Sequence, residues 1–113
     1  MSEQPLIDHT VLASLKTIMG RDFSQLIDTY LKDSELCLCH MQKALASGNS
    51  EALRRAAHSF KGSCSNIGAT SLVAHSQHIE QAAASDYLVG LETVLITLKS
   101  NFGQVRQQLA VYL

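Results

Sequence analysis

The last quarter of the chain carries apolar residues at alternating spacings of three and four, and this pattern most restricts what the sequence can fold into. Such spacing places the residues on one side of an α-helix, because the helix repeats every 3.6 residues. A strand needs alternation at every second position, which no stretch sustains. Gly90 and Gly103 would lie inside this helix and cost about 1 kcal/mol each relative to alanine. The apolar residues are Leu88, Leu91, Leu95, Leu98, Phe102, Val105, Leu109 and Tyr112.

Glycines divide the preceding sequence into further helices. Asp8 can cap a short first helix that runs to about Met19, and Gly20 supplies the left-handed residue that ends it. A second helix is expected over 22–46, ended by Gly48. Its apolar face comprises Phe23, Ile27, Tyr30, Leu31, Leu38, Met41 and Leu45.

Two more helices follow in the middle of the chain. Asn49 or Ser50 can cap a third helix, which Gly68 closes, and a fourth is expected over 70–84. Helices joined by short turns predict an all-α fold, an up-and-down antiparallel four-helix bundle with an additional short N-terminal helix as a lid. We expect a single domain over 1–113, with residues 1–7 as an N-terminal tail. The buried face of the fourth helix is expected to contain Leu72, Ser76, Ile79 and Ala83.

Composition excludes several classes of protein. The chain has 113 residues, is 46% hydrophobic and has a formal net charge of −1, which argues against disorder and against nucleic-acid binding. No apolar run reaches the roughly 18 residues of a membrane span, and the start lacks the pattern of a signal peptide. We therefore expect a cytoplasmic protein with no membrane contact. The three cysteines form no disulfide framework and are expected to be reduced thiols.

The stretch "AAHSFKGSCSNIGA", residues 56–69, places a histidine and a glycine on the outer side of the third helix. At 100° per residue, Leu53 and five residues after it share a buried face, whereas His58 falls about 140° and Gly62 about 180° away from Leu53. Arg54, Lys61 and Ser65 lie on the same outer side. The residues that share the buried face with Leu53 are Ala56, Ala57, Phe60, Cys64 and Ile67.

Gly62 is the residue that distinguishes a functional histidine at position 58 from an ordinary surface histidine. Helical side chains lean toward the N-terminus, so a larger residue at 62 would lean over the ring of His58 one turn earlier. Glycine leaves the ring uncovered at a cost in stability of about 1 kcal/mol. Lys61, Arg54 and Ser65 could support an anion attached to the ring. The residues alone leave two readings open, a phosphate-carrying or nucleophilic His58 and a solvated helix face.

This stretch resembles the signature of histidine-containing phosphotransfer (HPt) domains, Ala-His-x-Leu-Lys-Gly-Ser followed by Gly-Ala. Phe60 replaces the more common leucine, and Ser76 stands where many members carry cysteine or alanine. The resemblance implies a phosphorelay intermediate, in which His58 takes a phosphoryl group from the aspartate of one receiver domain and passes it to that of another. It implies that Lys61 helps hold the phosphoryl group. The matching residues are Ala57, His58, Lys61, Gly62, Ser63, Gly68, Ala69, Leu72, Ile79 and Glu80.

Such a domain needs to supply few chemical groups of its own. A nucleophilic imidazole must be neutral, and histidine changes charge nearest to neutral pH. Phosphoryl transfer needs positioning and charge stabilisation, and the receiver can supply the metal. The chain has no P-loop and no carboxylate cluster for magnesium. We therefore expect a phosphocarrier without ATP-dependent kinase activity and without a bound cofactor or metal, with Mg²⁺ in the partner receiver domain.

A partner also needs a docking surface around His58. If the second and third helices form an antiparallel hairpin, His58 lies level with about Cys39. Leu36 and Cys39 fall off the apolar stripe of the second helix, so we expect them to offer small apolar contacts beside His58.

Two rival functions remain. A metal or haem site would need ligands that converge from several helices, and His75 with His78 lacks a matching second pair, although His9, His40 and Cys64 exist elsewhere. The other rival is an adaptor that keeps the bundle and has no phosphate chemistry. Loss of the histidine would favour the adaptor, but His58 is present together with Lys61 and Gly62.

Overall fold

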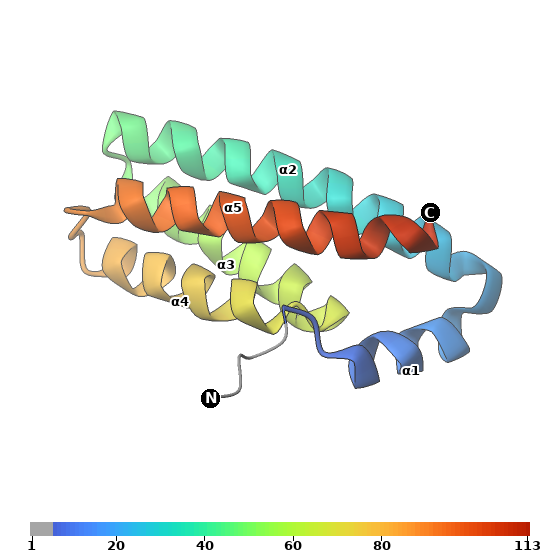
Figure 1. Cartoon of the computed structure of the whole chain (residues 1–113). Coiled ribbons are helices and arrows are strands. Elements are labelled where there is room, and N and C mark those ends of the chain that lie inside the picture. The colour runs from blue at the N-terminus through green and yellow to red at the C-terminus, as the bar shows by residue number, and fades with distance from the viewer. Residues whose placement is uncertain (1–5) are drawn as a thin grey trace.

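The computed structural model describes residues 6–113, and within that range it is helical with no strand (Figure 1). Helices α2 to α5 form an up-and-down antiparallel bundle, and α1 lies at one end of it. The predicted fold class is therefore confirmed. The elements are α1 (His9–Met19), the 3₁₀ turn η1 (Gly20–Asp22), α2 (Phe23–Ser47), α3 (Ser50–Ile67), α4 (Thr70–Ala84), α5 (Leu91–Leu109) and the 3₁₀ turn η2 (Ala110–Tyr112).

Several helices begin or end where the capping residues predict. The Asp8 carboxylate accepts hydrogen bonds from the backbone of Thr10 and Val11, which caps α1. Asn49, one of the two candidates, caps α3 by accepting from the backbone N–H of Ala52 at 3.1 Å. Gly48 ends α2 in the left-handed conformation at φ 68°.

Two expectations, one about the start of the last helix and one about the N-terminal tail, are wrong in detail. Gly90 lies outside α5, because it adopts φ 80° and serves as the N-cap, so the helix starts at Leu91 and Leu88 precedes it. Of the predicted tail, residues 1–5 lie outside the described residues, but Ile7 is only 1% exposed and belongs to the core. Burial of this apolar side chain attaches the start of the chain to the bundle.

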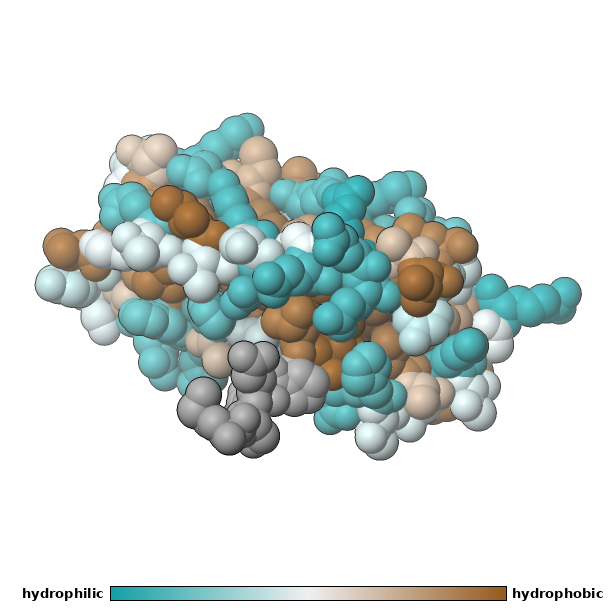
Figure 2. Space-filling view, viewed as in Figure 1, coloured by the Kyte–Doolittle hydropathy of each residue, from teal (hydrophilic) through white to brown (hydrophobic). Residues whose placement is uncertain are grey.

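The apolar faces of the helices meet in one core. The seam residues of α5 from Leu91 to Leu109 are buried, as are the predicted faces of α2 and α4. Phe102 packs near both Tyr30 and Phe60, with ring centroids 6.4 Å and 6.2 Å away. Figure 2 shows mainly hydrophilic side chains over the viewed face, with hydrophobic ones between them. None of the helices in residues 6–113 is long and apolar enough to cross a membrane.

The three cysteines carry free thiols. Cys64 is buried and contacts the Tyr30 hydroxyl at 3.1 Å, and burial raises the pKa of its thiol to about 12. The thiol therefore stays protonated at neutral pH, so Cys64 contributes to packing and is not a nucleophile.

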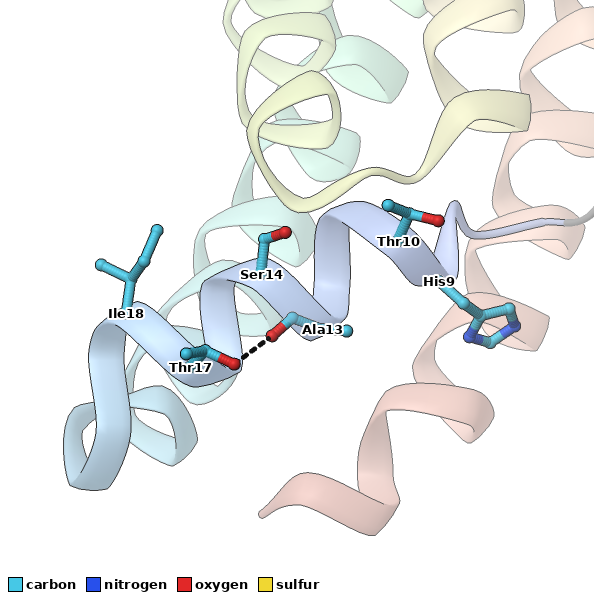
Figure 3. Close-up of a pocket in the computed structure, with 6 residues that line it drawn as sticks. All are labelled: His9, Thr10, Ala13, Ser14, Thr17 and Ile18. Carbon is cyan, nitrogen blue, oxygen red and sulfur yellow. Dashed lines mark hydrogen bonds between the residues drawn. The ribbon is translucent and has the colours of Figure 1, made fainter.

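α1 is held against the end of α3 through its first residues. The backbone N–H of Asp8 donates to the carbonyl of Gly68 at 2.7 Å. Figure 3 shows the opposite side of α1, where His9, Ala13 and Ile18 extend outward and the Thr17 hydroxyl bonds back to its own helix. Leu12 on the inner side of α1 is buried in the core, so α1 packs on the end of the bundle as a lid.

Gly68 is the glycine that the fold requires most. It adopts φ 83°, and a Cβ added there would lie 3.0 Å from the Cβ of Val11 and 3.2 Å from the carbonyl oxygen of Asp8. A side chain would be strained by the backbone and would also push α1 away.

We predict that Gly68→Ala lowers the free energy of unfolding by about 2 kcal/mol, measured by urea denaturation. Gly103→Ala is the matched control, because Gly103 lies inside α5 with no atom within 4 Å of an added Cβ. That control should gain up to about 1 kcal/mol. Equal stability of Gly68→Ala and the unaltered protein would contradict this account of the lid.

Candidate functional site

α3 presents His58 to solvent, as the helical wheel predicts. The His58 side chain is 65% exposed, and Gly62 and Ser65 are exposed on the same side of the helix. The opposite face is in the core, where Phe60 and Ala57 are completely buried and Ala56 is partly buried. The direction of His58 therefore follows from burial of the rest of α3.

Glu80 of α4 joins His58 to Lys61. One oxygen of its carboxylate, Oε2, lies 2.8 Å from Nδ1 of His58, and the other, Oε1, lies 2.6 Å from Nζ of Lys61. The Glu80 side chain is only 17% exposed, so this carboxylate sits at the base of the ring and is shielded from water. We call these three residues the His58 cluster.

The contact with Glu80 determines which nitrogen of the neutral ring is free. An ionised carboxylate only accepts hydrogen bonds, so Nδ1 of His58 must carry the proton and donate it. In the neutral imidazole, Nε2 then keeps its lone pair. Among residues 6–113 no side chain or backbone group is hydrogen-bonded to Nε2. In the neutral form, Nε2 is therefore the nitrogen that is left without a partner among the described residues.

Lys61 keeps Glu80 ionised. The Lys61 ammonium group, together with His58, holds the pKa of the Glu80 carboxyl below its ordinary value of 4.5. Partial burial acts in the opposite direction but is outweighed. Because the pKa is lower in the folded protein, the ion pair stabilises the fold above pH 4.5, and this stabilisation is lost as the pH falls through the lowered value. At neutral pH the cluster therefore contains a carboxylate that can accept from Nδ1.

Gly62 leaves open space one turn after His58. It is exposed, has no positive φ, and an added Cβ would meet no atom within 4 Å. Neither backbone conformation nor packing requires glycine at this position. Clearance above the ring is the physical explanation that remains, since a side chain at 62 would lean toward His58.

Arg54 and Ser65 lie on the same side of α3, but neither is hydrogen-bonded to the His58 ring. The guanidinium of Arg54 is paired with Glu51, at 2.7 Å and 3.1 Å, and it holds the pKa of that carboxyl below its ordinary range. Glu51 also pairs with Arg55 at 3.4 Å. These residues form an exposed charged group one to two turns before His58, whereas Ser65 follows it by two turns.

Of the expected docking pair, Leu36 and Cys39, Cys39 faces away from α3. Cys39 lines a groove between α2 and α5, whereas Leu36 is exposed and its role in docking stays a prediction. Cys37 is the residue of α2 that faces α3 here, with its sulfur 4.0 Å from the Ser59 hydroxyl. Residues two apart on a helix point about 200° apart. The hairpin alignment therefore predicted the correct level along α2, but it did not predict that Cys37, and not Cys39, faces α3.

A shallow cleft lies where Cys37 faces α3, on the α2 side of that helix. Its volume is about 420 Å³. Small side chains form much of its lining. The lining residues are Cys37, His40, Ala52, Arg55, Ala56 and Ser59.

Glu80 matches the resembled family, but the sequence alone did not indicate a role for it. The available signal was modest: Glu80 is the only acidic residue in the stretch 70–84, which otherwise carries no charged residue apart from two histidines. Nothing in that spacing indicates that α4 faces α3 at the level of His58.

The histidines of the metal hypothesis do not converge. Nδ1 of His75 contacts the carbonyl of Ser71 at 2.8 Å, while His78 is exposed. No group of three or more histidine, cysteine, aspartate or glutamate side chains suited to a metal ion occurs among residues 6–113.

Comparisons with known proteins relate this site to one family. The family model described as "Hpt domain" matches residues 25–109, which include the whole His58 cluster. The crystal structure of histidine-containing phosphotransfer protein B (HptB) from Pseudomonas aeruginosa PAO1 superposes with a TM-score of 0.92. It is 35% identical, and the match covers 96% of this chain and 94% of that one.

A structure from rice, assigned as a histidine-containing phosphotransfer protein, shares the fold. Its TM-score is 0.85 at 17% identity, covering 96% of this chain and 80% of that one. A search among curated protein sequences found no significant match. The family model spans most of the bundle, and the HptB structure covers 96% of this chain at 35% identity. This chain therefore belongs to the Hpt domain family.

Proposed function

We propose that His58 is the phosphorylated residue of this Hpt domain and acts as a phosphorelay intermediate. It accepts a phosphoryl group from the aspartate of a receiver domain, typically in a hybrid sensor kinase, and passes it to the receiver aspartate of a response regulator. One observation supports this most directly: Glu80 holds Nδ1 of an exposed His58 and leaves Nε2 open.

The transfer needs little from this chain. The Nε2 lone pair of His58 attacks the phosphorus of the aspartyl phosphate, the P–O bond to the aspartate breaks, and the aspartate leaves as a carboxylate. Nδ1 keeps its proton, so the ring becomes formally cationic while the phosphoryl group carries negative charge. Glu80 stabilises this ring through the hydrogen bond it already makes. The reverse attack by a second aspartate restores the neutral imidazole.

Lys61 and Gly62 serve the same step in different ways. Lys61 lies three residues after His58, and its ammonium can support the charge of the phosphoryl oxygens while remaining close to Glu80. Gly62 gives the receiver access to the ring, since no atom lies within 4 Å of its missing Cβ. Arg54 and Ser65, on the same side of α3 as His58, contact the phosphoryl group or the receiver domain.

The other properties follow from this role. We propose a cytoplasmic, monomeric phosphocarrier that has no ATP-dependent kinase activity and whose partners are receiver domains, with no contact to nucleic acid or membrane. The chain itself needs no cofactor, because the receiver supplies Mg²⁺ and the acidic pocket around its aspartate.

We predict that a phosphorylated receiver domain labels the protein on His58 with a phosphate that is acid-labile and base-stable. His58→Gln should abolish the label without unfolding the bundle, since the side chain is largely exposed. His78→Gln, an exposed histidine of α4, is the matched control and should label normally. Labelling is followed by autoradiography and folding by circular dichroism. A label that persists in His58→Gln would refute the assignment.

We predict that Gly62→Gln slows phosphoryl transfer by about tenfold or more, because a misplaced reacting group costs rates of that order or higher. The free energy of unfolding should stay the same or rise by up to about 1 kcal/mol, because glutamine is a better helix former. Gly103→Gln introduces the same side chain at another exposed helical glycine and should transfer normally. Normal transfer kinetics in Gly62→Gln would refute the clearance argument.

We predict that Glu80→Ala slows phosphorylation of His58 by about tenfold or more, since it removes the group that sets the tautomer. Phosphorus and nitrogen NMR of the phosphorylated protein should place the phosphoryl group on Nε2, and the variant should give a mixture of Nε2 and Nδ1 products. Glu92→Ala, an exposed acid of α5, is the control. An unchanged rate together with pure Nε2 product in Glu80→Ala would contradict the role of Glu80.

A further inference from the structure

A second helical glycine, like Gly62, is required neither by its backbone conformation nor by packing, but it lies on α5, away from His58. Gly103 is exposed in the interior of α5, has no positive φ, and no atom lies within 4 Å of an added Cβ. Glycine at such a position lowers helix stability relative to alanine, and nothing inside the molecule requires it. Its effect is to keep the adjoining surface open.

That surface is a groove between α2 and α5. Its volume is about 530 Å³, and it is lined mainly by apolar atoms. Leu38 and Phe102 form its buried floor, while Cys39 and Gly103 line it from the two helices. Because Gly103 lacks a side chain, the floor remains accessible from outside.

Polar contacts between α2 and α5 bound the groove at each end. Lys99 donates to the side-chain oxygen of Gln42 at 2.6 Å, and Arg106 is paired with Glu35. These contacts lie seven residues apart on each helix, which corresponds to about 10 Å, or two helical turns. The surface between these contacts therefore matches in length two turns of another helix packed against it.

The groove carries excess positive charge in a chain whose formal net charge is −1. Lys43, Lys99 and Arg106 line it, against the single acid Glu35. Figures 1 and 2 show the same side of the molecule: α5 runs beside α2, and hydrophilic side chains lie next to hydrophobic ones there. A complementary partner needs apolar side chains for the floor and carboxylates for the basic margin.

We propose that the α2–α5 groove binds an acidic amphipathic helix of a partner protein. His58 and its cluster lie on α3 and α4, across the bundle from this groove, so the helix can be bound while His58 exchanges its phosphoryl group. The groove thus holds a partner independently of phosphorylation and raises its effective concentration near His58.

The test uses a synthetic peptide of about 14 residues, four helical turns, with leucines spaced three and four apart and glutamates elsewhere. We expect the peptide to shift the NMR signals of residues 35–43 and 99–106 and to leave those of His58 and Lys61 unchanged. A second peptide, with lysine in place of each glutamate, should bind at least about tenfold more weakly. Shifts centred on another surface, or equal binding of the two peptides, would overturn the proposal.

Two variants of the protein test the groove itself. Gly103→Leu fills it with a side chain that favours helix, and should weaken binding of the acidic peptide by about tenfold or more while phosphorylation of His58 stays normal. The double substitution Lys43→Glu and Lys99→Glu should weaken it to a similar extent. Unchanged binding in Gly103→Leu would refute the site. A dimer in sedimentation velocity that Gly103→Leu disrupts would show that a second copy of the chain occupies the groove instead.

Discussion

Burial of the apolar face of α3 is the constraint on which the rest of the site depends. Phe60 is completely buried and packs against Phe102 of α5, while Cys64 contacts Tyr30 of α2 one turn later. Large side chains in such a core stabilise a fold by several kcal/mol each, so α3 cannot turn about its axis without a great loss. His58, two residues before Phe60, must therefore face solvent.

The Glu80 carboxylate converts this exposed histidine into an oriented one. Exposure alone leaves a ring free to rotate and to carry its proton on either nitrogen. A hydrogen bond from Nδ1 to a carboxylate removes both freedoms, and the ion pair with Lys61 keeps that carboxylate ionised and in place. The same contact spans α3 and α4, so the site exists only when the two helices are packed together.

Both exposed helical glycines were visible in the sequence, but only one could be interpreted from it. Gly62 follows a histidine by one turn, so local geometry was enough to connect the two residues. Gly103 has no such neighbour on its own helix. The far side of the groove that it lines, with Leu38, Cys39 and Gln42, comes from α2, and only the packed bundle brings the two sides together.

The sequence by itself determined the helices, most of their ends, their buried faces and the outward direction of His58, because each of these depends on a 3.6-residue repeat and on capping groups nearby in the chain. Tertiary structure decided which residues meet across helices: Glu80 with His58, Cys37 in place of Cys39 beside α3, and Ile7 in the core. Periodicity defines the faces of one helix, but the neighbour opposite each face depends on the rotation and axial position that give the best packing of all the helices together.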